Sequence, residues 1–140
     1  MKFFDLVKYR RSIRKYQDRQ IAREDLKKIM EAGLCAPNAG GGQRTIVVVV
    51  HNKDLCEKIG FYGAPAVCAI FAPKNFLYSI PDAFCCAENM VLAATELGLA
   101  SCIIARGEET FDNEPGAAFL KGVEYSRQPY CPLFRPFGLL

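Results

Sequence analysis

The sequence predicts one domain of the α/β or α+β class, in which helices surround a central sheet. Runs of β-branched residues alternate with segments of helical apolar periodicity, and one such run has no polar face, so both faces of that strand must be covered. The 140 residues are enough for a single domain with a sizeable core. With 51% hydrophobic and 24% charged residues, the composition is that of an ordinary globular protein.

The chain begins with a short predicted helix, residues 3–9, and continues into a basic segment, residues 10–16. Side chains alternate along an extended backbone, so Arg10, Ser12 and Arg14 are expected on one side of this segment. Two guanidiniums and a hydroxyl there would form a phosphate clamp. The alternatives are a solvated basic turn and a short basic interaction patch.

A second helix is predicted for residues 21–34, where apolar residues recur at helical spacing. The turn that follows, residues 36–43, reads Ala-Pro-Asn-Ala-Gly-Gly-Gly-Gln. Pro37 and the three glycines exclude regular structure and would let the backbone approach a ligand closely. The turn matches neither the P-loop nor the dinucleotide-binding fingerprint, and a flexible loop is the alternative interpretation.

The middle of the chain predicts two buried strands. Residues 45–50 are β-branched throughout, and residues 66–72 form a second apolar run. Residues 54–59, between these strands, predict a short helix. Residues 73–81 predict a loop with exposed aromatic side chains.

A long helix is predicted for residues 82–97, where apolar residues run nearly all round the helix axis. Such a helix is buried, either in the core or at a subunit interface. Asp82 suits its N-cap, and Gly98 suits its C-terminal end. A third strand is predicted for residues 100–105 and a further helix for residues 114–121.

Charge, hydropathy and cysteine usage exclude several classes of function. A net charge of +3 with scattered Lys and Arg argues against nucleic acid, and no apolar run reaches the length of a membrane span. The N-terminus lacks the pattern of a secretory signal. Seven cysteines without a C-x-x-C pair predict free thiols in a reducing cytoplasm. Since His51 is the sole histidine, we expect neither a metal site nor a Ser-His or Cys-His catalytic pair.

Five separated stretches agree with one family pattern in their order and spacing. They are Arg10-Arg11-Ser12-Ile13-Arg14, Ala36-Pro37-Asn38-Ala39 with Gln43 beyond it, the strand Ile46–Val50, Asp82-Ala83 with Asn89-Met90, and Leu97-Gly98-Leu99-Ala100-Ser101-Cys102. With this ordered set, the sequence resembles the nitroreductase family of flavin enzymes in its small, single-domain form. The resemblance covers residues 1–121, and no single stretch carries it.

The resemblance implies an α+β fold with a central mixed or antiparallel sheet flanked by helices. It also implies an intertwined homodimer that binds FMN at its interface. Electrons would pass from NAD(P)H to FMN and then to nitroaromatics, quinones or similar acceptors. Because the cofactor does the redox chemistry while the protein supplies binding, orientation and charge, no side chain need act as a catalytic nucleophile.

Two groups of cofactor-binding residues are carried over by position. The residues implied to hold the FMN phosphate and ribityl chain are Arg10, Arg11, Ser12 and Arg14. The residues implied to lie against the flavin from the partner subunit are Pro37, Asn38 and Ala39, with Gly41 and Gln43 nearby.

The turn departs from the family pattern at two places. Gly41 stands where the family usually has Asn, which removes one side-chain contact to the cofactor. Gln43 is followed by Arg44 and Thr45, where the family usually has Pro-Trp. The tryptophan packing is lost, and a positive charge enters near the implied site.

The third departure is the tail, residues 122–140, in which no helix or strand periodicity is present. If one extra G follows the Lys121 codon, the tail can be back-translated so that the shifted frame encodes EWNIPDSHIARCFVLLGY, the family continuation. The hypothesis is therefore an FMN-binding domain, residues 1–121, that lacks its C-terminal strand and carries an out-of-frame tail. An unpaired sheet edge, weaker FMN retention and lower stability would follow. The alternative is a genuine divergent tail.

Three functions remain open from the sequence. The first is the FMN-dependent NAD(P)H oxidoreductase. The second is a flavin-binding or flavin-storage module with little or no turnover, which Gly41, Arg44 and the tail favour. The third is a non-enzymatic interaction domain, in which the basic residues 10–15 bind an acidic partner.

Overall fold

A three-stranded antiparallel sheet, in the order β1-β2-β3, forms the centre of the molecule. The structure is a computed structural model that describes residues 1–111, 113 and 134–139. The strands are β1 (Ile46–Val50), β2 (Val67–Pro73) and β3 (Phe134–Leu139). β1 and β2 pair in continuous register, with Val48 opposite Ala69, whereas the pairing of β2 with β3 shifts between Ile70 and Phe71.

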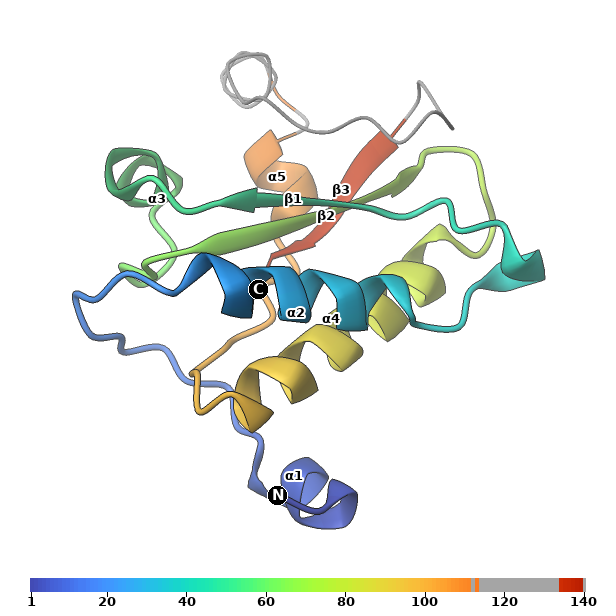
Figure 1. Cartoon of the computed structure of the whole chain (residues 1–140). Coiled ribbons are helices and arrows are strands. Elements are labelled where there is room, and N and C mark those ends of the chain that lie inside the picture. Colours follow the sequence, from blue (N-terminus) through green and yellow to red (C-terminus); the bar gives the residue numbers. More distant parts are fainter. Residues whose placement is uncertain (112, 114–133, 140) are drawn as a thin grey trace.

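Helices cover both faces of this sheet (Figure 1). The helices are α1 (Phe3–Tyr9), α2 (Arg23–Leu34), α3 (Lys53–Ile59), α4 (Ser79–Glu96) and α5 (Gly107–Phe111). α2 and α4 lie side by side on one face, and α5 lies on the other. α1 projects from this body and contacts α4. None of the described helices is long and apolar enough to cross a membrane.

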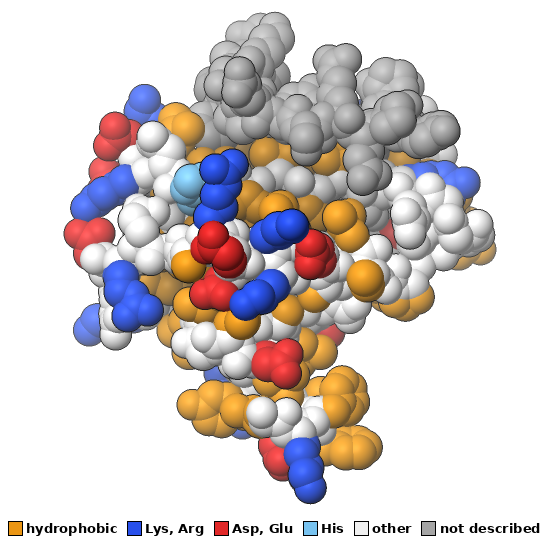
Figure 2. Space-filling view, in the orientation of Figure 1, with side chains coloured by type: hydrophobic (Ala, Val, Ile, Leu, Met, Phe, Trp, Pro, Cys, Tyr) orange, Lys and Arg blue, Asp and Glu red, His pale blue; other side chains and the backbone are white. Residues whose placement is uncertain are grey.

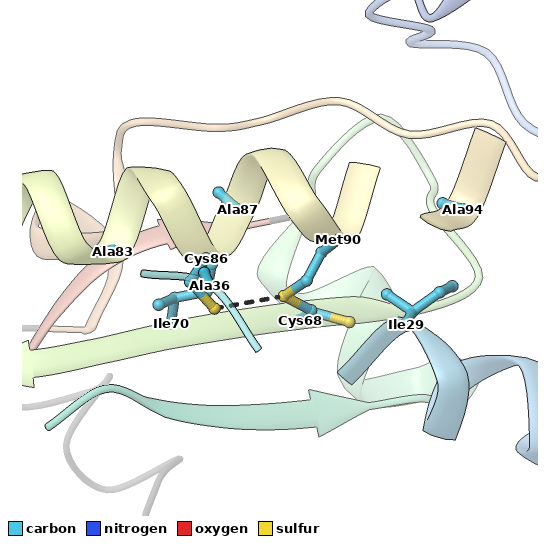
Figure 3. Close-up of a cluster of buried hydrophobic side chains, with 9 residues drawn as sticks. All are labelled: Ile29, Ala36, Cys68, Ile70, Ala83, Cys86, Ala87, Met90 and Ala94. Atoms are coloured by element: carbon cyan, nitrogen blue, oxygen red, sulfur yellow. Dashed lines mark hydrogen bonds between the residues drawn. The ribbon is translucent and has the colours of Figure 1, made fainter. Parts of the chain in front are cut away.

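One apolar cluster on each face explains why β2 has no exposed side. Ile70 packs in the cluster beneath α4, while its neighbours Ala69 and Phe71 pack in the cluster on the opposite face. This alternation follows from the two-residue period of a strand. Ile70 and Met90, which belong to the same cluster (Figure 3), are completely shielded from solvent at 0% exposure. The predicted burial of β2 is confirmed. β1, which was predicted to be buried on both faces, is only partly buried at Ile46, Val47 and Val49.

α2 and α4 approach each other closely at Gly33. A Cβ atom at this position would lie 2.6 Å from Met90 Cγ and 2.9 Å from Cys86 Sγ, so a side chain there requires displacement of the core. On the same interface, Asn89 Nδ2 donates to the carbonyl of Ala32 at 3.0 Å. These contacts hold α4 against α2 in a defined position.

The predicted start of the long helix is wrong. α4 begins at Ser79, so the end of the predicted loop, residues 73–81, is helical. Pro81 is tolerated there because the N–H groups of a first helical turn have no partner within the helix. Asp82 therefore lies inside the first turn, and the N-cap is Tyr78. The predicted C-terminal end is confirmed, since Gly98 takes a left-handed φ of 73°.

Other corrections concern short segments. The predicted strand 100–105 is replaced by an extended connection with an isolated parallel bridge between Ser12 and Ser101. The turn 36–43, predicted to be irregular, contains one 3₁₀ turn, η1 (Ala39–Gly41). The short helix α5 was not predicted, and the helix predicted for residues 114–121 lies outside the described residues.

The tail supplies a strand, contrary to the prediction that the sheet lacks its last one. β3 pairs with β2 along residues 134–139, with Pro136 opposite Phe71 beside the shift of register. Proline cannot donate to a ladder and is tolerated at edges and bulges, which fits this position. Phe-Arg-Pro-Phe-Gly-Leu does not alternate polar and apolar residues, so its periodicity gave no signal.

Candidate functional site

The basic segment, residues 10–16, leaves α1 in an extended conformation. Arg10 ends the helix with φ −50° and ψ 133°. Ser12 then forms a parallel bridge with Ser101, and the N–H of Ile13 donates to the Ser101 carbonyl at 2.9 Å. The segment is thus held beside the chain that follows α4, and its side chains remain largely exposed.

The hydrogen-bond donors of the basic segment differ in how many partners they already have within the chain. Arg10 Nε lies 3.6 Å from Glu88 Oε1, and Arg11 Nη1 donates to the carbonyls of Lys8 and Arg10 at 2.6 and 2.7 Å. Arg14 lies over the ring of Tyr62, 6.0 Å from its centroid. The Ser12 hydroxyl has no hydrogen-bond partner among residues 1–111, 113 and 134–139.

The second group of predicted residues forms one tight turn. Asn38 Oδ1 accepts from the N–H of Gln43 at 2.8 Å, and the Asn38 carbonyl accepts from the N–H of Gly41 at 3.1 Å. Gly40 and Gly41 have φ 62° and Gln43 has φ 42°, all in the left-handed region that favours glycine. A Cβ atom at Gly40 or Gly41 would meet nothing within 4 Å, so this side of the turn is open.

Two residues outside the predicted set hold this turn against α4. The N–H of Ala39 donates to Asp82 Oδ1 at 2.9 Å, and Arg44 Nη1 donates to the Ala39 carbonyl at 3.0 Å. The Arg44 guanidinium also lies 4.5 Å from the ring centroid of Phe76. The sequence singled out Asp82 as a cap and Arg44 as a departure from the family pattern, but it held no signal that they share one partner.

The two predicted groups lie at different places along α4 (Figure 1). Ala39 is held in the first turn of α4, whereas Ser12 pairs with Ser101, beyond the end of the helix. A helix of 18 residues is about 27 Å long. Within the described part of the chain, no hydrogen bond or ion pair joins residues 10–14 to residues 37–43. One chain therefore does not bring the two groups into one site.

A cavity of about 570 Å³ is lined by none of the nine predicted residues. Its walls include Tyr16, Ile21, Leu26 and Met90. Tyr16 follows the basic segment directly, and burial, with a smaller contribution from Cys102, raises the pKa of its hydroxyl to about 12. This hydroxyl therefore stays protonated at neutral pH and can donate a hydrogen bond. A second space of only about 20 Å³ touches the turn at Pro37.

The described cysteines are all free, which agrees with the predicted thiols. Burial raises the pKa of Cys68 to about 12 and that of Cys86 to about 11, so both thiols are protonated and unreactive at neutral pH. Cys85, next to Cys86, is exposed. Among the described residues, no group of His, Cys, Asp and Glu could hold a metal ion.

Comparisons with known proteins show the family of the chain. A sequence model of the nitroreductase family matches residues 7–62 and 54–110. The chain belongs to the nitroreductase family. A protein of Methanothermobacter thermautotrophicus, named NADH dehydrogenase/NAD(P)H nitroreductase, is 36% identical in an alignment of 113 positions that covers 72% of this chain. A Bacillus subtilis protein named FMN reductase [NAD(P)H] is 43% identical over 49 residues, which are 35% of this chain and 20% of that protein.

Solved nitroreductase structures share the fold. A nitroreductase from Bacteroides fragilis with bound FMN has a TM-score of 0.86 and 27% identity, over 97% of this chain and 84% of that chain. An FMN-dependent nitroreductase from Clostridium difficile R20291 has a TM-score of 0.80 and 28% identity, over 98% of this chain and 84% of that chain.

The chain spans less than two thirds of the length of the sequence relatives. The matches to the Methanothermobacter protein and to a similarly named Archaeoglobus fulgidus protein span 59% and 63% of their lengths.

Proposed function

We propose that this nitroreductase is an FMN-dependent oxidoreductase that carries electrons from NAD(P)H to nitroaromatics, quinones or similar acceptors. The observation that carries the proposal is the exposed donor set of residues 10–14, to which the resemblance assigns the phosphate of FMN. The names of the relatives, NAD(P)H nitroreductase and FMN reductase, support the electron donor and the cofactor.

The donors of the basic segment fit a phosphate. The Ser12 hydroxyl is unpartnered within the described ranges, and Arg11 and Arg14 keep N–H groups that face solvent. Each charge-assisted hydrogen bond to a phosphate oxygen contributes about 1.5–3 kcal/mol. Glu88 offsets part of the charge of Arg10, so we expect Arg11, Ser12 and Arg14 to contribute more than Arg10.

The turn 36–43 fits a flat ring that approaches its backbone. The open side of Gly40 and Gly41 leaves room for such a ring. Pro37, Asn38 and Ala39 precede this open side, and Gln43 closes the turn by donating to Asn38. Because Gly41 has no side chain, we assign the contacts at this position to backbone groups.

A second copy of the chain would bring the two groups of residues together. α1 carries four large apolar side chains that are exposed in a single chain: Phe3, Phe4, Val7 and Tyr9. Figure 2 shows apolar side chains gathered on the projecting part of the molecule that α1 forms. Exposed apolar patches of this kind are typical of protein interfaces. We assign this face to the homodimer, in which the turn of one subunit lies beside the basic segment of its partner.

The chemistry divides between cofactor and protein. Bound FMN would accept electrons from NAD(P)H and donate them to the acceptor. The protein's own task is binding and orientation: Ser12 and the arginines hold the phosphate end, and the backbone of the turn lies against the ring. Cationic and N–H groups beside the ring would stabilise negative charge on it. No side chain is assigned as a nucleophile.

The first test is the visible absorption spectrum of the purified protein. Flavin absorption, with FMN released on heating, is the expected result. The second step is NAD(P)H oxidation with a quinone as acceptor. A protein that stays colourless after incubation with FMN would overturn the proposal.

A flavin-storage module is the second candidate, favoured by Gly41 and by the charge of Arg44 beside the turn. Under this alternative, FMN binds with ordinary affinity but NAD(P)H oxidation stays at the rate of free FMN. The same two measurements therefore separate storage from turnover. A basic interaction domain would bind no chromophore at all.

The tail, residues 122–140, remains a candidate for an out-of-frame sequence. In the shifted frame, positions 134–139 encode Phe-Val-Leu-Leu-Gly-Tyr, and these are the positions that pair with β2. That hexapeptide has higher β propensity than Phe-Arg-Pro-Phe-Gly-Leu and lacks its proline, which supports the hypothesis. Sequencing the gene across the Lys121 codon decides it, because an uninterrupted frame without an extra base contradicts a frameshift.

We place the protein in the cytoplasm. The described cysteines are free, and three of them, Cys56, Cys68 and Cys86, are buried thiols whose pKa burial raises. Free thiols persist in a reducing compartment. Fractionation of cells that express the tagged chain would check this placement.

A further inference from the structure

We infer that Asp82 and Arg44 are positioning residues for the cofactor, because together they hold Ala39, and with it the turn 38–43, against the start of α4. The inference rests on the proposed function, since it assigns the turn to FMN. It adds two residues that lie outside the predicted cofactor-binding set and act through the turn.

Asp82 is a buried carboxylate with a specific partner. Asp82 is 7% exposed, and its Oδ1 accepts a hydrogen bond from the N–H of Ala39 at 2.9 Å. The bond joins residues 43 positions apart in the chain. This hydrogen bond is partly buried, so the loss of its acceptor would destabilise the turn in this position.

Arg44 binds the peptide group that follows Ala39, whereas Asp82 binds the one that precedes it. Nη1 donates to the Ala39 carbonyl at 3.0 Å, and the guanidinium is stacked 4.5 Å from the ring centroid of Phe76. The guanidinium also lies against the backbone of Gly42, where a Cβ atom would overlap it. Phe76 in turn contacts Tyr78, the N-cap of α4, with ring centroids 5.8 Å apart.

The shape of the turn and its orientation have different origins. Its shape is set internally, by the Asn38–Gln43 hydrogen bond and the left-handed glycines. Its orientation relative to α4 is set by Asp82 and Arg44, which bind the peptide groups on either side of Ala39. Loss of either anchor would leave a turn of the same shape that no longer presents its backbone to the ring at a defined position.

The test compares Asp82→Ala with Asp82→Asn by two measurements. Asn keeps the oxygen that accepts from Ala39 and removes the charge. Amide hydrogen exchange of Ala39, measured without FMN, should accelerate by roughly tenfold or more in Asp82→Ala and by much less in Asp82→Asn. FMN affinity, measured by quenching of flavin fluorescence, should fall by roughly tenfold in Asp82→Ala and recover in Asp82→Asn.

Asn52→Ala is the matched control for Asp82→Ala. Asn52 Oδ1 also accepts one backbone N–H, that of Leu55 at 3.1 Å, but it caps α3 on another part of the molecule. This variant should lower stability and leave both Ala39 exchange and FMN affinity unchanged. Circular dichroism confirms that each variant is folded at the temperature of the assay. If Asn52→Ala weakened FMN binding as much as Asp82→Ala does, loss of stability would explain both and the inference would fail.

Arg44→Met tests the second anchor, with Arg106→Met as its control. Arg106 is an exposed arginine paired with Glu109 at 2.7 Å. We expect FMN affinity to fall by roughly threefold to tenfold in Arg44→Met and to stay constant in Arg106→Met. Unchanged Ala39 exchange and FMN affinity in both Asp82→Ala and Arg44→Met would overturn the inference. A wild-type protein that binds no FMN would instead overturn the proposed function, while the exchange rates would still report on the anchors.

Discussion

Two regions of the molecule differ in what surrounds their apolar side chains. The first is the sheet with the helices that cover it. The second is the N-terminal arm, which we define as α1 and residues 10–16. Ile70 and Met90 in the first region are 0% exposed, whereas Phe3 and Phe4 in the second are 64% and 75% exposed. The core region is thus stabilised by contacts within one chain. Apart from the buried Leu6, the large apolar side chains of α1 are exposed in a single chain, as expected for the dimer surface that we propose. Stability and cofactor binding can therefore be altered separately.

The largest expected effect comes from the core. Met90→Ala removes a completely buried side chain between α4 and the sheet and should lower the free energy of unfolding by about 2–5 kcal/mol. Phe4→Ala, the matched change in the arm, should alter it by no more than about 0.5 kcal/mol. Urea denaturation at a concentration where the chain is monomeric checks both. Equal losses in the two variants would mean that the arm belongs to the core.

The arm should instead control association. Replacing Phe3 and Phe4 together by Ser should weaken the proposed homodimer by roughly tenfold to a hundredfold, because two exposed aromatic side chains lose their apolar contact with the partner. Sedimentation equilibrium measures the dissociation constant. As a control, Leu77→Ser changes an exposed apolar residue outside the arm. A wild-type chain that is monomeric at all concentrations would contradict the assignment of this surface.

The basic part of the arm should discriminate between two flavins. Arg14→Gln removes a guanidinium that faces the phosphate of FMN in our proposal, so FMN affinity should fall by roughly tenfold. Riboflavin has no phosphate, and its weaker affinity should stay the same in wild type and variant. Fluorescence titration with both ligands checks the difference. An equal loss for riboflavin would show that Arg14 does not act on the phosphate.

The last comparison concerns the pH dependence of the stability of the core. Burial raises the pKa of Cys68 to about 12, whereas an unfolded thiol has a pKa of about 8.5. The folded state therefore holds this proton more tightly, and its contribution is complete below pH of about 8.5 and is lost as pH rises toward the folded value. The loss amounts to at most about 1.4 kcal/mol per pH unit.

Cys68→Ala should flatten this alkaline slope, which urea denaturation between pH 8 and pH 10, about the window in which the unfolded thiol ionises, would show. Cys85→Ala is the control, because Cys85 is exposed and belongs to neither cluster of the core. An unchanged slope in Cys68→Ala would mean that this thiol does not titrate between the two states. The arm offers no comparable buried thiol.

Secondary structure followed from local patterns wherever one pattern dominated. The β-branched run of β1 and the apolar run of β2 predicted two strands, and Gly98 predicted the end of α4. The predictions failed where local signals were mixed. Pro81 suggested a loop although it lies in the first turn of a helix, and Pro136 concealed a strand that pairs with the edge of β2.

The nine predicted cofactor residues fall into the two groups that the resemblance implies, one in the extended basic segment and one in the turn. An extended basic segment was expected, whereas the turn, expected to be irregular, contains the 3₁₀ turn η1. Its internal bonds join residues only a few positions apart. The hydrogen bond that anchors the turn to α4 could not be predicted. Ala39 and Asp82 are 43 positions apart, and neither periodicity nor composition indicates that two such residues will meet.

The sequence by itself determined the family, the extent of most helices and strands, and the residue types that a phosphate requires. Each of these depends on local spacing or on an ordered set of short motifs. The tertiary structure alone decided the order of the strands, the contact of Gly33 with Met90, and the role of Asp82 beside Ala39. These features depend on which distant segments pack together, and that is set by the burial of apolar surface over the whole chain.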